Sequence, residues 1–173
     1  MEFLNVEIKA KYSRLDAARQ ILKDLRAEFK GTDHQIDTYF KVRRGRLKLR
    51  QGEIEQHLIY YKRDDQQNPK SSRVILYKSE SNSVLKEVLT RSLGVQVIVD
   101  KRREIYFIDN VKFHLDSVKY LGTFMEIEAI DRDGKIGENT LHQQCQHYMK
   151  TFNISPSDLI ACSYSDMLIN YWK

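Results

Sequence analysis

The sequence predicts an α+β fold in which about eight mainly antiparallel strands close into a barrel, with helices packed on the outside. Three observations lead to this prediction. Most of the expected strands follow one another along the chain, which favours antiparallel pairing. Charged side chains alternate with aliphatic ones along the central strands, so each of these strands has one charged face. The expected helices carry apolar stripes, which can cover the aliphatic face of the sheet.

The alternation also fits an ordinary antiparallel sheet with one face in solvent, and pattern alone does not separate the two arrangements. A barrel with charges inside makes sense if its interior is wet and holds a highly charged ligand, because unpaired buried charges are costly. The order of the charges favours the barrel. Basic residues gather at 46–50 and 101–103, and carboxylates gather at 126–128.

The chain has 173 residues and an apolar fraction of 41%, so we expect one domain over residues 1–173. Its N-terminal segment lacks the basic start and apolar core of a signal peptide, and no apolar run approaches the roughly 20 residues that span a membrane. Cys145 and Cys162 have no ligand-like spacing. We therefore expect a reduced, cytoplasmic protein, monomeric or homodimeric, with no membrane partner. The formal charge of +5 points only weakly to an anionic partner.

The first half of the chain predicts one helix among five strands. Residues 3–12 alternate as a strand with one buried face. Ser13 has the position of a helix N-cap, and helical spacing continues to Phe29, with Gly31 as the stop signal. Turn residues then separate four expected strands, at 35–42, 46–51, 57–63 and 72–78.

The second half predicts helices on either side of three strands. A helix is expected at 82–93 and ends at Gly94. The pair Asp109-Asn110 fits a tight turn between the first two of the strands that follow. A further helix is expected at 139–152, and a short helix near the C-terminus is capped by Ser163 or Ser165. The three strands are expected at 95–108, 111–119 and 123–130.

Several segments, taken in order, resemble the CYTH superfamily, also called the triphosphate tunnel metalloenzymes. The family signature is an N-terminal strand of the form Glu-x-Glu-x-Lys, and the matching segment here is Asn5-Val6-Glu7-Ile8-Lys9. The details are closest to the class IV adenylyl cyclase-like branch. The other matching segments cover nearly the whole chain: Asp37-Thr38-Tyr39, Leu47-Lys48-Leu49-Arg50, Ile59-Tyr60-Tyr61-Lys62, Lys101-Arg102-Arg103 with Tyr106, Leu115-Asp116, Phe124-x-Glu126-Ile127-Glu128 and Ser163-Tyr164-Ser165.

This resemblance implies a metal-dependent enzyme that acts on a triphosphate-bearing substrate such as ATP, inorganic triphosphate or thiamine triphosphate. The reaction would be cyclisation of ATP to cyclic AMP and pyrophosphate, or hydrolysis of a triphosphate. Mg²⁺ or Mn²⁺ would be held by Glu7, Glu126 and Glu128. The implied triphosphate-binding residues are Lys9, Lys48, Arg50, Lys62, Lys101, Arg103 and His114, and of these Lys9, Arg50 and Arg103 would also be catalytic.

The sequence departs from the family pattern at three places. Asn5 stands where the signature has Glu, the strand at 74–78 lacks the Glu that such proteins usually carry, and Cys162 precedes the closing Ser-Tyr where a basic residue is frequent. A second hypothesis is therefore a nucleotide- or polyphosphate-binding domain that has lost turnover. His114 is equally compatible with a hydrogen-bonded strand histidine, and Asp116 with a residue that only orients a nearby arginine.

An RNA-binding domain is a third hypothesis, and it ranks lowest. The basic residues alternate with aliphatic ones instead of forming a continuous exposed stripe, and the tyrosines are scattered. A nucleic-acid partner is therefore not expected. The sequence leaves open which organic group the triphosphate carries.

Overall fold

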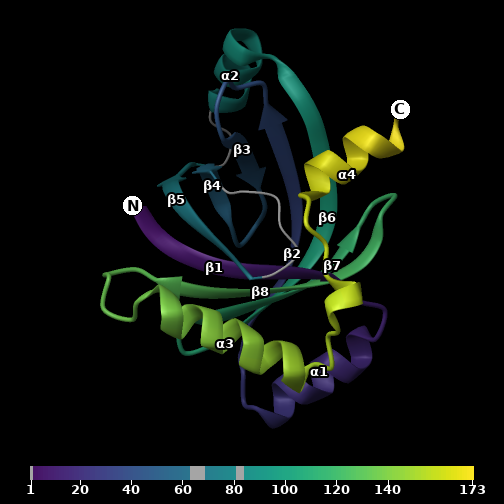
Figure 1. Cartoon of the computed structure of the whole chain (residues 1–173). Helices are drawn as coiled ribbons and strands as arrows, with labels where there is room; N and C mark the ends of the chain where they lie inside the picture. Colours follow the sequence, from purple (N-terminus) through teal and green to yellow (C-terminus); the bar gives the residue numbers. More distant parts are fainter. Residues whose placement is uncertain (1, 63–68, 81–83) are drawn as a thin grey trace.

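The computed structural model describes residues 2–62, 69–80 and 84–173, and within them the strands form one closed barrel (Figure 1). The order around the barrel is β1-β5-β4-β3-β2-β6-β7-β8, and β8 pairs with β1 to close it. All neighbouring strands are antiparallel, as predicted. The strands are β1 (Glu2–Lys11), β2 (Glu28–Phe40), β3 (Arg46–Gln51), β4 (Gln56–Lys62), β5 (Lys70–Lys78), β6 (Val95–Ile108), β7 (Val111–Val118) and β8 (Gly122–Asp131).

The helices lie on the outside of the barrel (Figure 1). Helices α1 (Leu15–Asp24) and α3 (Glu138–Thr151) lie beneath β1 and β8 in this view, α2 (Leu85–Leu93) connects β5 to β6, and α4 (Tyr164–Tyr171) packs beside β6. A short 3-10 turn, Pro156–Asp158, precedes α4. None of the helices in the described part of the chain is long and apolar enough to cross a membrane.

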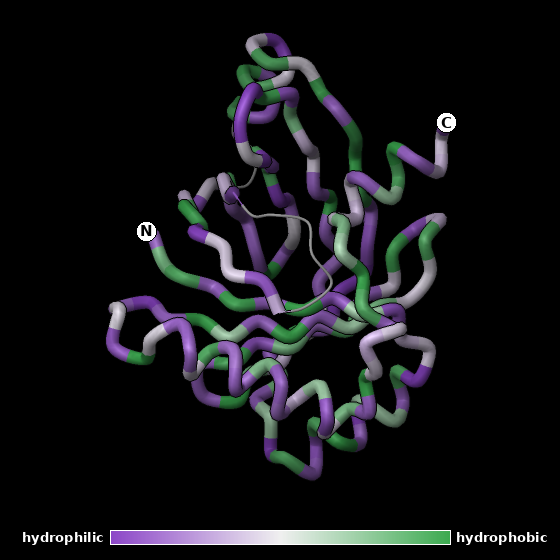
Figure 2. Tube along the Cα trace, in the orientation of Figure 1, coloured by the Kyte–Doolittle hydropathy of each residue, from purple (hydrophilic) through white to green (hydrophobic). Residues whose placement is uncertain are grey.

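The main hydrophobic core lies between the helices and the outer face of the barrel. Figure 2 shows hydrophilic and hydrophobic residues alternating along the strands of this region. The aliphatic residues point outward to the helices, so the charged residues of the same strands point into the barrel. This is the arrangement that the period of two predicts. The buried strand residues of this core are Val6, Ile8, Ala10, Val111, Phe113, Leu115, Met125, Ile127 and Ala129, and α1 and α3 add Ala18, Leu22, Leu141 and Cys145.

The predicted end of the first helix is wrong. The helix stops at Asp24, and Arg26 takes a left-handed conformation with φ of 56°. The strand that follows, β2, begins at Glu28, so Phe29 belongs to a strand and contacts the ring of Tyr106. The apolar spacing suggested a longer helix, but residues from Glu28 onward pair with the long strand β6 instead. Tertiary pairing here outweighs the helical pattern.

Other boundaries follow the sequence more closely. Gly94 ends α2 with φ of 75°, and Ser163 caps α4 by accepting a hydrogen bond from the Asp166 amide. Ser13 does not cap the first helix, because the N-cap is Arg14 without a side-chain hydrogen bond. Residue 63 of the strand expected at 57–63, and residues 82 and 83 of the helix expected at 82–93, lie outside the described residues.

The turn between β3 and β4 folds toward the barrel because Asp33 anchors it. Asp33 is fully buried on β2, and its carboxylate accepts hydrogen bonds from the backbone amides of Glu53, Ile54 and Glu55 at 2.7 to 3.1 Å. Gly52 permits this close approach, since a Cβ at that position would lie 2.4 Å from Asp33 Oδ2. The turn is therefore fixed to the barrel by a buried anion.

We predict that Gly52→Ala destabilises the protein by about 1–3 kcal/mol, because the added methyl displaces Asp33 from the amides that it accepts. Urea unfolding followed by circular dichroism measures the loss. Glu53→Ala is the control, because Glu53 is exposed in the same turn and its loss is expected to change stability by less than about 0.5 kcal/mol. Equal stability of Gly52→Ala and the wild-type protein would contradict the close approach.

Candidate functional site

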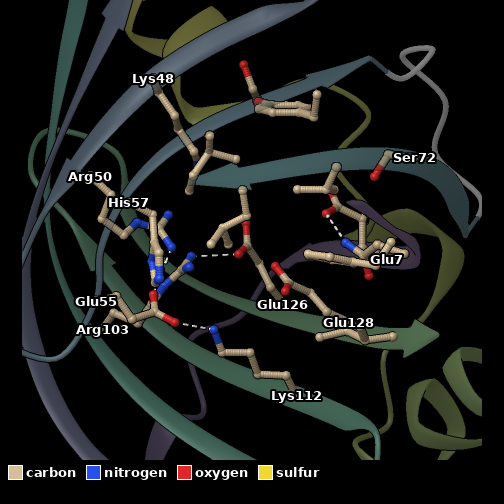
Figure 3. Close-up of a pocket in the computed structure, with 18 of the residues that line it drawn as sticks. Glu7, Lys48, Arg50, Glu55, His57, Ser72, Arg103, Lys112, Glu126 and Glu128 are labelled. Carbon is tan, nitrogen blue, oxygen red and sulfur yellow. Dashed lines mark hydrogen bonds and ion pairs between the residues drawn. The ribbon is translucent and has the colours of Figure 1, made fainter. Parts of the chain in front are cut away.

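The charged faces of the strands enclose a cavity of about 650 Å³ inside the barrel (Figure 3). Side chains from every strand of the barrel and from the segment that enters α4 line it. Basic residues outnumber acidic ones among the described lining residues, which suits an anionic ligand. The basic residues are Lys9, Lys48, Arg50, Lys78, Lys101, Arg103, Lys112 and Arg132, and the acidic residues are Glu7, Glu55, Glu126 and Glu128.

Asp37 on β2 gathers three of the basic side chains. The Arg50 guanidinium donates two hydrogen bonds to its carboxylate, at 2.8 and 2.9 Å. The amino groups of Lys101 and Lys48 lie 2.7 and 3.2 Å from Asp37 Oδ2. Burial alone would raise the pKa of Asp37, but the three cations hold it well below its usual range. Asp37 is therefore a buried anion that positions the basic side chains.

The negative charge around Lys101 is too small to offset the burial of its amino group. Burial lowers the pKa of Lys101 to about 7, since the single carboxylate of Asp37 is shared with Arg50 and Lys48. For Lys48, burial also lowers the pKa, but Asp37 and Tyr39 more than compensate and raise it above its usual value. Lys101 is thus the side chain of this cluster whose charge changes near neutral pH.

A second buried cluster surrounds Arg103. Its guanidinium donates to Asp116 at 2.7 and 2.5 Å and to Glu126 at 2.6 Å. The Tyr164 hydroxyl donates to Asp116 at 2.8 Å, so the first residue of α4 holds the same carboxylate. Lys9 lies 3.2 Å from the other oxygen of Glu126 and 4.2 Å from the Tyr164 ring centroid. Asp116 therefore orients Arg103, which is one of the two roles that the sequence leaves open for Asp116.

The acidic residues form a corner on β1 and β8. Glu7 and Glu128 are directly opposite in the strand register, which is unfavourable for two like charges without a cation nearby. His114 supports the corner from β7, with Nδ1 at 3.2 Å from Glu126 and 3.6 Å from Glu128. One ligand atom from each of His114, Glu126 and Glu128 lies within 4.8 Å of the others. The two carboxylates of this group are the kind of ligand that a hard divalent cation takes.

Asn5 adds a neutral oxygen beside this corner. Its side-chain amide donates to Glu7 at 3.2 Å, and the residue is 4% exposed. Asn5 Oδ1 is buried and has no hydrogen-bond partner among the described residues, although Asn5 lines the cavity. A buried carbonyl oxygen without a donor is the kind of atom that a bound cation satisfies. The substitution of Glu by Asn in the signature therefore keeps an oxygen at the site and removes one charge.

The turn between β3 and β4 places one more carboxylate in the cavity, and the sequence did not reveal it. Glu55 accepts hydrogen bonds from Arg50 at 2.9 Å, from Gln35 at 2.9 Å and from Lys112. Burial would raise the pKa of Glu55, but Lys112 and Arg50 hold it well below its usual range. Figure 3 shows Glu55 pointing at Lys112, away from the acidic corner.

The structure brings most of the predicted site residues together. Lys9, Lys48, Arg50, Lys101, Arg103, Glu7, Glu126 and Glu128 all line the cavity. Lys62 does not, because His57, Ile59 and Tyr61 of β4 point inward and the residues between them point outward. Lys62 instead borders a separate depression with Arg46 and Asp166. His114 is fully buried behind the carboxylates and is absent from the cavity lining.

Lys112 and His57 are among the lining residues that were not selected from the sequence. Lys112 shares a face with His114 and Asp116, so its inward direction follows from the alternation, and only its pairing with Glu55 is new. His57 lines the cavity opposite Arg50 in the register. Burial lowers the pKa of His57, so its ring is mainly neutral at pH 7. No motif marks His57, because it is the second residue of a short strand on which both faces mix polar and apolar residues.

One wall of the cavity is apolar. Residues of β1, β4 and β5 form this wall, and three of them, Ile59, Tyr61 and Val74, pack together with Phe3 as a separate hydrophobic cluster. Leu76 continues the wall along β5. The cavity therefore has a charged side and an apolar side, which suits a ligand with both an anionic and an organic part.

Comparison with known proteins gives a consistent result. The family model described as the CYTH domain matches residues 4–160. A Methanocaldococcus jannaschii protein named "putative adenylate cyclase" is 25% identical in an alignment of 173 positions. The alignment covers 95% of this chain and 98% of the relative. The solved structure of the PH1012 protein from Pyrococcus horikoshii has a TM-score of 0.79 at 23% identity, covering 94% of this chain and 98% of that one. A "putative adenylate cyclase" from Vibrio parahaemolyticus has a TM-score of 0.75 at 17% identity, covering 96% and 98%.

We predict that binding of inorganic triphosphate at pH 8.5, without metal, takes up as much as about one proton. Lys101 has a pKa of about 7 in the free protein, so it is mostly neutral at this pH, and a bound polyanion favours its charged form. The affinity therefore falls as the pH rises from 7 to 9. Calorimetry in two buffers with different ionisation enthalpies measures the uptake.

Lys101→Met is expected to abolish this proton uptake. Lys48→Met is expected to keep only part of it, because Lys48 is already protonated in the free protein, but its removal leaves more of the Asp37 charge to Lys101 and raises the pKa of Lys101. Binding by the wild-type protein without uptake would show that Lys101 is charged before the ligand arrives.

Proposed function

Because the chain belongs to the CYTH domain family, we propose that it is an enzyme that acts on a triphosphate-bearing substrate inside the barrel. The observation that carries this proposal is the enclosed cavity in which a basic side faces an acidic corner. Arginine and lysine hold phosphate oxygens, and carboxylates hold a hard divalent cation. Both are needed for a reaction at phosphorus, where catalysis consists mainly of positioning and charge stabilisation.

Mg²⁺ or Mn²⁺ is the proposed cofactor, held by Glu7, Glu126 and Glu128 with the free oxygen of Asn5 nearby. The opposed carboxylates of Glu7 and Glu128 support this assignment, and so does Asn5 Oδ1, which has no hydrogen-bond partner in the part of the chain that the structure describes. When bound, the cation would neutralise charge on the phosphates of the substrate. His114 has a positioning role, since it donates to Glu126 and stands behind both carboxylates of β8.

The basic residues bind and orient the phosphate chain in this proposal. Lys9 and Arg103 are paired with Glu126, so a phosphate and a cation at this place would share one hydrogen-bonded network. Lys48 and Lys101 contribute charge from the Asp37 cluster. Because these donors are already held by buried carboxylates, little reorganisation is needed when charge develops during the reaction.

Cyclisation of ATP is the reaction that we favour. The apolar wall of Phe3, Ile59, Val74 and Leu76 gives an organic group a surface that inorganic triphosphate would not use. The names of relatives in the family point the same way. In this reaction the 3′-oxygen of the ribose bonds to the α-phosphorus, the bond from that phosphorus to the bridging oxygen breaks, and pyrophosphate leaves. The 3′-hydroxyl proton is released.

A binding domain without turnover is the second candidate. Asn5 supports it, because the corner has one negative charge fewer than the family signature provides. Glu126 supports it too, because Lys9, Arg103 and His114 already contact its carboxylate.

The test is incubation with ATP, inorganic triphosphate or thiamine triphosphate, each with Mg²⁺ or Mn²⁺. We expect cyclic AMP and pyrophosphate from ATP, whereas release of phosphate would indicate a hydrolase. Glu126→Gln is expected to reduce turnover on the order of 100-fold. Glu28→Gln is the control, because Glu28 is exposed on β2. Binding of all three compounds with no product at substantial protein concentration would reject the enzyme and favour the second candidate.

A further inference from the structure

Glu55 is an acidic side chain among basic partners, and the function proposed above gives it no role. Its carboxylate accepts from Arg50 Nη1 and Gln35 Nε2, each at 2.9 Å, and from Lys112. Its side chain is 13% exposed and lines the cavity. An anion in such a place reduces the charge that a polyanionic ligand meets.

The contacts of Arg50 show that the Glu55 carboxylate takes the place that a phosphate group of the ligand would need. Arg50 donates through Nε and Nη2 to Asp37, and through Nη1 to Glu55. Arg50 is thus engaged by a carboxylate on both sides. The Glu55 carboxylate lies where a phosphate oxygen would have to lie to contact Arg50 and Lys112 together, since carboxylate and phosphate use the same donor geometry.

A hydrogen bond of its backbone amide fixes Glu55 to the barrel. Its amide donates to Asp33 Oδ2 at 3.1 Å, beside the amides of Glu53 and Ile54, and Asp33 is fully buried. The close approach at Gly52 holds the same turn. Withdrawing the turn would break these three hydrogen bonds and leave the buried Asp33 carboxylate with the Gln35 amide as its remaining donor among the described residues, which is costly.

We propose that Glu55 is a specificity-determining residue that limits the length of the phosphate chain that the cavity accepts. This inference rests on the proposed function. The phosphates lie among Lys9, Lys101 and Arg103 and end before Glu55. The Glu55 carboxylate excludes a further phosphate because it repels the negative charge and already accepts the hydrogen bonds of Arg50 and Lys112. Without the Glu55 side chain, Arg50 and Lys112 become free to bind a fourth phosphate.

The test compares ATP with adenosine 5′-tetraphosphate by calorimetry in the presence of EDTA, so that no metal-dependent turnover occurs. For Glu55→Ala we expect the ratio of Kd for ATP to Kd for the tetraphosphate to rise about tenfold, the value of one new charge-assisted contact. Glu55→Gln keeps the volume and removes the charge, and we expect a smaller rise. Adding Lys112→Met to Glu55→Ala is expected to return the ratio toward the wild-type value.

Glu53→Gln is the matched control, because it removes one charge from the same turn at an exposed position. Its ratio is expected to equal that of the wild-type protein. Circular dichroism confirms that each variant is folded. If folded Glu55 variants bound both nucleotides more tightly by the same factor, Glu55 would only lower the local potential and the inference would be overturned. An unchanged ratio would overturn it too. If the wild-type protein bound neither nucleotide, the proposed function would fail first.

Discussion

The pairing of charges inside the barrel is the constraint on which the rest of the structure depends. Asp37 and Asp116 are 1% and 0% exposed, and each is bonded by an arginine at close range. Removal of one partner from such a pair typically costs about 3–5 kcal/mol, because the other charge is left buried and uncompensated. The basic side chains proposed to bind phosphate are therefore also half of the interactions that make a charged interior tolerable. Recognition and stability use the same bonds here.

This constraint explains why alternation in the sequence was informative. Along the central parts of β1, β7 and β8, every second residue is apolar and belongs to the core beneath the helices, so the direction of Glu7, Lys112 and Glu126 follows from the pattern. The pattern fails on β4, where His57, Ile59 and Tyr61 face the cavity and both faces mix polar and apolar residues. Lys62 was assigned to the cavity from the family motif, but it lies on the face of β4 opposite to His57, Ile59 and Tyr61. One residue of offset reverses every side chain of a strand.

The sequence could not predict the segments in which no regular spacing of apolar residues indicates the direction of the side chains. Glu55 lies in a turn, and its direction is set by Asp33 and Gly52, which are separated from each other by a strand and a turn. The end of α1 was misplaced because Leu25 and Phe29 continue its apolar spacing, although both remain substantially exposed at 41% and 53%. In both cases a long-range contact decides the local structure, and long-range contacts leave no local signature.

The closure of the barrel also links the site to the folding of the whole chain. Glu7 pairs in register with Lys70 on one side and with Glu128 on the other, and Lys70 donates to the Ala161 carbonyl at 2.6 Å. The acidic corner therefore exists only after distant parts of the chain have met, which carries a large loop-closure cost during folding. A ligand that binds only this closed state stabilises every strand at once, by about 2.7 kcal/mol at a hundredfold excess over its Kd. Ligand binding and folding of the barrel are thus linked equilibria, so the concentration of free ligand sets the fraction of the chain that is folded.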